Sequence, residues 1–546
     1  MNRLFAVTPL ALSLATSGWA QTSPSARLAQ AADSQAFRAH FEYLADDLLE
    51  GRAPATRGGE LAAKYIAAQF RRLGLEPAGD SGSYFHTVPI VALTGAPQLL
   101  ARGPGAVPLR APDDYVLWSE RNEPTVSFRG GAVFVGYGIT APEWEWDDYA
   151  GADVTGKLVF CLVNDPGLSN PAIFRGPILT YYGRWTYKIE EAARRGAAGI
   201  ILIHTTESAT YPWSTVVGST SGERVRLEKA PSPLVVAGWM RDEAVGRLLR
   251  GAGLDPDKLM GDAGRKGFRA VSLPLEFDAT VESAIRRSAT ANVVGRLPGR
   301  GPHAREAVMI GGHYDHLGIR APVNGDSIYN GAEDNASGTA AVLAAAEAFV
   351  RSGTVPGRSL LFMAFGAEES GLLGSEAFAE RPTLPLADLA AVLNLDVMNL
   401  YGPTTDIAAT GADHTSLGRT LATAARAEGL TISIDSLALV RGSFFRSDHF
   451  PLVRRGVPAL SMEQGRRYAD RPAGWGEERK QEYITHRYHK PQDEVLPWYS
   501  YQGPLQQLRV ALRVALEVAN APSQPVWGRD SEFRVAGEAR VGPKPQ

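Results

Sequence analysis

Apolar side chains recur at helical spacing near the start of the chain. Within residues 34–75 the recurring positions are Phe37, Phe41, Leu44, Leu48 and Leu49. This spacing predicts an amphipathic helix, because residues three and four apart share one face. A second helical run covers residues 60–73 and stops at Gly74, a residue type that commonly ends helices. Residues 80–130 are rich in glycine, proline and short β-like runs.

The pattern changes over residues 131–285. Short apolar runs at 132–135, 158–163 and 199–204 predict strands, and residues 187–195 predict a helix that ends at Gly196. We find no cluster of carboxylate and histidine residues in this segment. It is therefore predicted to be a β-rich unit without a reaction centre of its own.

From residue 292 onward, apolar strands alternate with helices. We expect strands at 307–310, 360–365, 391–395 and 458–461, and an alanine-rich helix over 335–350. This alternation is typical of an α/β domain with a mixed, mostly parallel sheet flanked by helices. The tail after residue 522 has no clear period.

Composition narrows the class of protein. A chain of 546 residues exceeds one typical domain, and 44% hydrophobic residues suffice for a large core. The 56 basic and 59 acidic residues nearly cancel, leaving a formal charge of −3. Without a basic excess or a polybasic run, we expect no nucleic-acid partner and no membrane-surface partner.

The N-terminus has the pattern of a cleavable secretory signal. Residues 1–20 begin with a positive charge at Arg3, continue with an apolar stretch and end in small residues before Gln21. The apolar stretch is too short for a membrane anchor. We therefore expect an exported protein, periplasmic or extracellular. The single cysteine, Cys161, sits in an apolar run and is predicted to be a buried hydrophobic residue.

Two segments of the α/β region place metal-binding side chains beside predicted elements. His313 and Asp315 lie in Gly-Gly-His-Tyr-Asp-His, directly after a strand, where an imidazole suits zinc and a nearby carboxylate orients it. Asp334 opens the alanine-rich helix within residues 331–338. Its carboxylate either caps that helix or bridges two metal ions.

Three more segments complete the pattern. Glu368 and Glu369 follow a strand as a pair, so that one can bind metal while the other takes a proton, unless both form a solvated turn. Asp396 ends an apolar strand and needs either a metal or an arginine as partner. His489 lies in a polar loop, where His486 is an equally plain alternative. Together these residues fit a two-metal hydrolase with zinc, for which cobalt or manganese could substitute.

The segments GGHYDHLG, GAEDNASG, GAEESGLLGS, LNLD and YHKPQDE resemble the secreted bacterial di-zinc aminopeptidases of the leucyl aminopeptidase type, relatives of glutamate carboxypeptidases. The resemblance covers roughly residues 34–110 and 287–520. It implies a zinc exopeptidase fold, and residues 131–285 resemble the protease-associated (PA) domain often inserted in this family. The implied division is a signal peptide (1–20), peptidase segments (34–130 and 286–520), a PA insertion (131–285) and a C-terminal tail (521–546).

The resemblance also implies a role for each motif residue and two zinc ions per chain. His313 and Asp396 would complete the first zinc site, Glu369 and His489 would complete the second, and Asp334 would bridge both. Glu368 would be the general base for a metal-bridging hydroxide that attacks the peptide, and Asp315 would orient His313. No role follows for His316 or His486.

One stretch departs from the family pattern. Some relatives carry a tyrosine shortly before a Ser-Asp-His segment, whereas this chain has Phe444 and Phe445 before Ser447. A phenol donor from that position is absent, so an additional donor would come from elsewhere, with Tyr483 and Tyr488 as candidates.

Three alternatives to an aminopeptidase remain open. A carboxypeptidase or dipeptidase on the same scaffold would need a cationic pocket, for which Arg441, Arg446 and the pair 454–455 are available. A non-catalytic binding protein of this fold would lack the ligand set. A cyclase-like acyl transferase would use one zinc. The sequence leaves the preferred substrate residue and the oligomeric state open.

Overall fold

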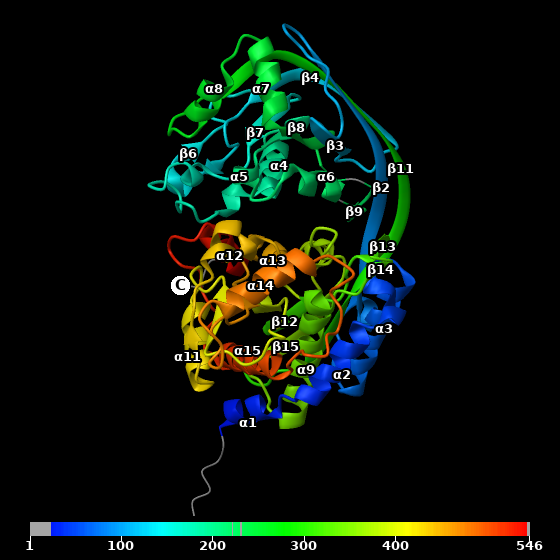
Figure 1. Cartoon of the computed structure of the whole chain (residues 1–546). Helices are drawn as coiled ribbons and strands as arrows, with labels where there is room; N and C mark the ends of the chain where they lie inside the picture. Colours follow the sequence, from blue (N-terminus) through cyan, green and yellow to red (C-terminus); the bar gives the residue numbers. More distant parts are fainter. Residues whose placement is uncertain (1–22, 221, 230–231, 543–546) are drawn as a thin grey trace, which may run out of the picture.

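The computed structural model describes residues 23–542 except 221 and 230–231. The expected signal peptide, residues 1–20, lies outside the described residues. Two lobes are stacked one above the other (Figure 1). One long blue strand and one long green strand run between them. We call residues 103–270 the insert lobe, and residues 23–84 together with 298–542 the main lobe.

The strands β2 (Phe85–Arg102) and β11 (Val271–Leu297) join the lobes as a long antiparallel ribbon. Arg102 pairs with Glu276 at one end and Phe85 with Val293 at the other. At its main-lobe end β11 pairs with β15 (Ser359–Phe365), and at its insert-lobe end it pairs with β4 (Thr125–Phe134). A single mixed sheet of fifteen strands therefore runs through the described part of both lobes.

The main lobe surrounds the parallel strands of this sheet. Its other strands are β1 (Glu76–Pro77), β12 (Ala307–His313), β13 (Gly318–Val323), β14 (Asp326–Tyr329), β16 (Leu389–Leu395), β17 (Asp406–Thr410), β18 (Thr431–Ile432) and β19 (Ala459–Glu463). Its helices are α1 (Pro24–Ala31), α2 (Ser34–Leu44), α3 (Arg57–Arg72), α9 (Ser337–Ser352), α10 (Leu373–Glu380), α11 (Leu417–Ala427), α12 (Ser436–Arg441), α13 (Phe450–Arg454), α14 (Trp475–His486), α15 (Gln502–Asn520) and α16 (Arg534–Val541). The neighbours β15, β12, β16 and β19 all run parallel.

Helices cover both faces of the main-lobe sheet. Along β12, Val308 and Ile310 pack with α2, α3, α9 and α15, whereas Ala307 and Met309 face the side of α10 and α13. Alternate residues of a strand point to opposite faces, so a strand buried on both faces is apolar throughout. This explains the continuous apolar runs in the sequence, and the predicted α/β fold with a mixed sheet flanked by helices is confirmed.

The insert lobe has its own helices as well as strands. Its strands are β3 (Tyr115–Ser119), β5 (Thr140–Ala141), β6 (Trp146–Asp147), β7 (Leu158–Leu162), β8 (Gly199–His204), β9 (Glu223–Leu227) and β10 (Val236–Arg241). Its helices are α4 (Trp185–Arg194), α5 (Thr206–Ala209), α6 (Trp213–Thr220), α7 (Asp242–Gly251) and α8 (Pro256–Ala263). The strands β4, β7, β8 and β10 are parallel neighbours, so this segment is α/β as well as β-rich. The strand β3, which precedes residue 131, pairs with β10.

Candidate metal centre

The five sequence segments meet at one edge of the main-lobe sheet. His313 is the last residue of β12, Glu368 follows β15, and Asp396 follows β16. Because these strands are parallel neighbours, their carboxyl ends lie at the same edge, where ligands bind in open α/β sheets. Asp334 lies in the turn 332–336 that leads into α9, and its peptide bond to Asn335 is cis.

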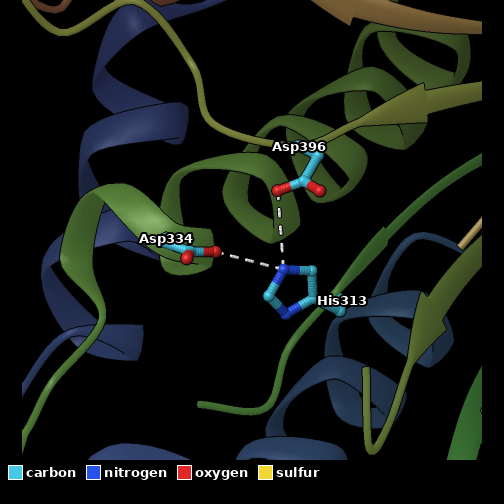
Figure 2. Close-up of side chains that lie close together, drawn as sticks. All are labelled: His313, Asp334 and Asp396. Atoms are coloured by element: carbon cyan, nitrogen blue, oxygen red, sulfur yellow. Dashed lines mark ion pairs between the residues drawn. The ribbon is translucent and has the colours of Figure 1, made fainter. Parts of the chain in front are cut away.

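His313 faces two carboxylates (Figure 2). Its Nε2 lies 3.2 Å from Oδ1 of Asp334 and 3.5 Å from Oδ1 of Asp396. The three side chains offer ligand atoms that all lie within 4.8 Å of one another. Burial alone would lower the pKa of His313, but the surrounding carboxylates raise it well above its usual range. A buried imidazole that faces this much negative charge is a suitable position for a cation.

A second group shares Asp334 with the first. Nε2 of His489 lies 3.3 Å from Oδ2 of Asp334 and 3.2 Å from Oε2 of Glu369. His313 and His489 therefore approach different oxygens of the same carboxylate. This is the arrangement that a carboxylate shared between two metal ions requires, and it favours that interpretation of Asp334 over a helix cap.

His316 also belongs to this second group. It is fully buried, and its Nδ1 lies 2.7 Å from Oε1 of Glu369. His316, Asp334 and Glu369 likewise place ligand atoms within 4.8 Å of one another. Neither ring nitrogen of His316 forms a hydrogen bond within the described residues, and neither does Oε1 of Glu369. Sequence reasoning left His316 without a role, although its place three residues after His313 marks the same strand end.

Asp315 acts on the glutamate pair as well as on His313. Nδ1 of His313 lies 3.1 Å from the main-chain carbonyl oxygen of Asp315, and 3.9 Å from its carboxylate. The carboxylate instead accepts hydrogen bonds from the backbone N–H groups of Glu368 and Glu369, at 3.0 and 3.3 Å. Burial raises the pKa of Asp315 to about 6. Asp315 thus fixes the start of the loop after β15, in addition to facing His313.

Asp493 holds the loop of Asp334 from the opposite side. Its two carboxylate oxygens accept hydrogen bonds from the backbone N–H groups of Glu333 and Asp334, at 2.9 and 3.0 Å. The hydroxyl group of Tyr483 donates a further bond of 3.2 Å to the same carboxylate. Asp493 is fully buried and lies four residues after His489, so it connects both ligand segments. No feature of the polar run 488–494 distinguishes Asp493 from its neighbours at the level of sequence.

Glu333 is tied to a buried arginine next to this loop. Its carboxylate lies 3.3 Å from Arg487 Nη1 and accepts a hydrogen bond from Tyr401 at 3.0 Å. Burial raises the pKa of Glu333 to about 8. Because this carboxylate already has an arginine partner, it differs from its neighbour Asp334, which faces histidines alone.

Glu368 stands beside the ligand cluster, where its carboxylate faces His313 at a longer distance than Asp334 and Asp396 do. Its Oε2 lies 3.9 Å from Nε2 of His313, too far for a hydrogen bond. Burial, together with nearby negative charges such as Glu369, raises the pKa of Glu368 well above its usual range. A carboxylate with this environment is suited to take up and release a proton.

These side chains open onto a cavity of about 340 Å³. It is lined by His313, Glu333, Asp334, Glu368, Glu369, Asp396, Val397, Leu437, Ala438, Arg441, Ser443, Arg446, Ser447, Ser461, Glu463, Gln464, Lys480, Tyr483, Ile484, Tyr488 and His489. The volume is at the small end of the range for small-ligand sites, roughly 300–1,000 Å³. The donor set of imidazole and carboxylate groups without thiolate fits zinc.

The aromatic residues near the cavity have different surroundings. Phe444 and Phe445 are buried, and Phe444 stacks on His414 with ring centroids 5.0 Å apart. Tyr488 stacks on His489 at 3.9 Å and lines the cavity. Tyr488 therefore places a phenol beside the ligand cluster from a different segment than the one occupied by Phe444 and Phe445.

His486 and the remaining candidates lie apart from the cluster. His486 ends α14 and is exposed, so it is not among the grouped metal-ligand side chains. Cys161 is fully buried in the insert lobe, as predicted. No helix in the described part of the chain is long and apolar enough to span a bilayer.

Two known proteins match part of this chain. Leupeptin-inactivating enzyme 1 of Streptomyces exfoliatus is 29% identical over 225 residues, which cover 39% of this chain and 47% of that protein. Leucine aminopeptidase 1 of Trichophyton rubrum is 33% identical over 105 residues, covering 18% of this chain and 27% of that protein. The chain thus spans about half or less of the length of these relatives.

Two solved structures align over most of the chain. The aminopeptidase from Aneurinibacillus sp. strain AM-1 has a TM-score of 0.47 at 19% identity, covering 92% of this chain and 97% of that one. The zinc aminopeptidase BSAP from Bacillus subtilis has a TM-score of 0.44 at 17% identity, with the same coverage. In addition, residues 292–502, which contain every side chain of the ligand cluster, match the model of Peptidase family M28.

Proposed function

We propose that the protein is a zinc-dependent exopeptidase, and more narrowly an aminopeptidase that releases N-terminal residues from peptides. One observation carries the proposal: two groups of metal-binding side chains share Asp334 and open onto a cavity that also contains the carboxylate of Glu368. The match of this region to Peptidase family M28, and its similarity to a leucine aminopeptidase, support the same activity.

Each ligand residue has a place in this proposal. His313 and Asp396 would hold one zinc ion, Glu369 and His489 the other, and Asp334 both. When bound, the two ions supply Lewis acidity, which activates a water molecule and polarises the scissile carbonyl group. Asp315 and Asp493 keep the ligand loops in place through their hydrogen bonds to backbone N–H groups.

Glu368 transfers the proton, and the charges around the cavity position the peptide. Glu368 takes the proton of the attacking water and passes it to the nitrogen of the leaving amine, so that the carboxylate is regenerated. The free amino group of a peptide is positively charged and is attracted by carboxylates of the cavity that hold no zinc ion, such as Glu463. This attraction places the N-terminal residue, and hence the first peptide bond, at the reaction centre.

Removal of the metal tests the proposal directly. We expect two zinc ions per chain by elemental analysis, and hydrolysis of leucine p-nitroanilide that is lost on chelation and returns with zinc. Cobalt or manganese could substitute for zinc in this experiment. A chain that binds no metal, or that keeps full activity after complete chelation, would contradict the proposal.

The two histidines near Glu369 allow a finer test. His489 and His316 both lie within 3.2 Å of this carboxylate. If His489 holds the second ion, His489→Ala should reduce the zinc content to about one ion per chain, whereas His316→Ala should retain nearly two. The opposite result would transfer the ligand role to His316.

A carboxypeptidase or dipeptidase is the second candidate, and the cavity wall favours it in one respect. Arg441 and Arg446 line the cavity, whereas Arg454 and Arg455 are both paired with Glu376. N-acetylated dipeptides separate the activities, because a carboxypeptidase cleaves them and an aminopeptidase does not. Leucine p-nitroanilide gives the complementary result.

The proposal also covers export and the insert lobe. Export rests on residues 1–20, and the mass of the mature secreted chain would test it. We propose that the insert lobe is a PA-type unit that controls access of peptides to the cavity rather than taking part in the reaction. Its removal should alter the preference for peptide length while leaving hydrolysis of leucine p-nitroanilide in place.

A further inference from the structure

The cavity has opposite charges on its two sides. The ligand cluster supplies carboxylates, including Asp334, Glu369 and Asp396, while Arg441 and Arg446 belong to the wall formed by α12 and the turn that follows it. The nearby Lys480 is paired with Asp435 at 3.0 Å. In the described part of the chain, neither Arg441 nor Arg446 forms an ion pair with a carboxylate. Their charges are therefore available to a ligand in the cavity.

The position of Arg446 is fixed by its own turn. Its Nε donates a hydrogen bond of 3.0 Å to the main-chain carbonyl oxygen of Arg441. Between them Gly442 has a φ of 63°, and a side chain added there would meet Leu179 of the insert lobe at 2.6 Å. Close packing at Gly442 thus brings the two lobes together at the turn that carries both arginines.

The insert lobe adds a third unpaired arginine beside this turn. Tyr181 packs its ring against Phe445 and Phe450, with centroids 6.2 and 5.1 Å away. Three residues further on, Arg184 is 8% exposed, and its Nε has no hydrogen-bond partner among the described residues. Burial, together with the positive charge of Arg446, lowers the pKa of Arg184 to about 9.

A buried arginine is normally paired, because leaving its charge without a counter-ion is costly. Here α12 lies on the side of the main lobe that faces the insert lobe (Figure 1). Arg184 reinforces the positive potential of Arg446 instead of neutralising it. Three guanidinium groups that have no acidic partner in the part of the chain that the structure describes are thus concentrated near one wall of the cavity, an arrangement that an anion would complete.

The charge pattern orients a peptide substrate. A free amino group is repelled by the arginines, so the N-terminal residue lies away from them, on the side of the ligand cluster. The part of the substrate that follows the scissile bond then points toward Arg441 and Arg446. Arg441 and Arg446 line the same cavity as the ligand cluster, so they face the part of the substrate next to the scissile bond.

We propose that Arg441 and Arg446 form a subsite for a carboxylate on the residue that follows the scissile bond. This inference rests on the proposed function. The carboxylate has two possible sources: the C-terminus of a dipeptide, or the acidic side chain of the second residue in a longer peptide. A planar guanidinium group binds a carboxylate through two parallel hydrogen bonds, which gives both affinity and orientation.

Four matched substrates test the subsite and separate its sources. Leu-Gly and Leu-Gly-amide differ only in the terminal carboxylate, while Leu-Asp-amide and Leu-Asn-amide differ only in the side-chain carboxylate. We expect kcat/KM of the wild-type protein to be about tenfold or more higher for the charged member of at least one pair, which is the usual effect of a hydrogen-bonded charge. The pair that shows the preference identifies the source.

Variants connect the preference to the two arginines. Arg446→Gln and Arg441→Gln should each reduce the ratio within the preferred pair, the double variant should bring it close to one, and Arg446→Lys should restore part of it. Arg419→Gln is the matched control, because Arg419 is an exposed arginine of α11 and is not part of the cavity wall. Its ratio should equal that of the wild type, and circular dichroism should show that all variants are folded.

The outcomes distinguish this inference from the function on which it rests. Equal kcat/KM within both pairs, or a preference that survives in the folded double variant, would overturn the subsite while leaving the aminopeptidase intact. A zinc-loaded protein that releases leucine from none of the four substrates, nor from leucine p-nitroanilide, would overturn both.

Discussion

The two lobes place polar residues at the ends of parallel strands in the same way, but they use them differently. In the insert lobe, Asp165 follows β7 and is fully buried. Its carboxylate accepts hydrogen bonds from the backbone N–H of Gly167 at 3.0 Å and from the hydroxyl group of Thr180 at 2.6 Å. In the main lobe, Glu369 follows β15, and its Oε1 accepts no hydrogen bond within the described residues.

The histidines at the strand ends show the same contrast. His204 ends β8, where its Nε2 lies 3.1 Å from the carbonyl oxygen of Tyr211 and its ring packs against Trp213 and Trp239. His313 ends β12 and directs Nε2 at carboxylates alone. The strand-end position therefore does not by itself make a metal centre. The distinguishing feature is a set of carboxylate oxygens, on Asp334, Glu369 and Asp396, that face the imidazole groups of several histidines.

The largest expected effect is the loss of activity on substitution of Glu368, which lies in the main lobe. Glu368→Gln removes the proton acceptor but keeps the volume of the side chain, so kcat should fall by about 10²–10⁴-fold. The zinc content should remain at two ions per chain, because Glu368 is not assigned as a ligand. Steady-state kinetics and elemental analysis on the same sample check both points. Full activity in this variant would remove Glu368 from the reaction.

A smaller effect is expected at Asp493, which holds the loop of Asp334 without touching the cavity. Asp493→Asn retains one acceptor oxygen but loses the charge that two backbone N–H groups share. Zinc affinity should fall about 10- to 100-fold, as is usual for groups that orient metal ligands. Competition with a chelator measures this affinity. Restored activity at high zinc would distinguish positioning from misfolding, and unchanged affinity would contradict the role of Asp493.

The smallest effect is expected for Asp165 in the insert lobe, where a substitution should change stability and not activity. Asp165→Asn weakens the bonds from Gly167 and Thr180, which should lower the free energy of unfolding by about 1–2 kcal/mol. Its kcat/KM and zinc content should equal those of the wild type. Denaturant unfolding and leucine p-nitroanilide hydrolysis measure the two properties. A loss of zinc in this variant would show that the strand ends of the two lobes are not as independent as their hydrogen bonds indicate.

Much of the main-lobe fold could be predicted from the sequence because its strands are buried on both faces. The apolar runs at 307–310, 360–365 and 391–395 all lie inside observed strands, namely β12, β15 and β16. The helix expected over 335–350 corresponds to α9, although it begins at Ser337 after a separate turn. The residues that follow these strands could be identified from local pattern alone.

Other features depend on contacts that are distant in sequence. The middle of β11 is largely polar and exposed, so its apolar period is too weak to indicate a strand of 27 residues. The helix α16 lies in the tail, for which no period was apparent. The roles of His316 and Asp493 depend on the proximity of the end of β12 to the loop 488–494, which is distant from it in sequence. Their residue types are common in loops, and no local spacing distinguishes them.

The ribbon of β2 and β11 has a consequence for the architecture as a whole. Because Arg102 and Glu276 are Cα partners, the chain leaves the ribbon and returns to it at neighbouring points. In topological terms, everything between them is the loop of one very long hairpin. Such a loop can be exchanged, shortened or replaced by a tight turn while the register of the hairpin persists. The main lobe is thus open to other accessory modules at this point, and each of them would stand where the insert lobe stands.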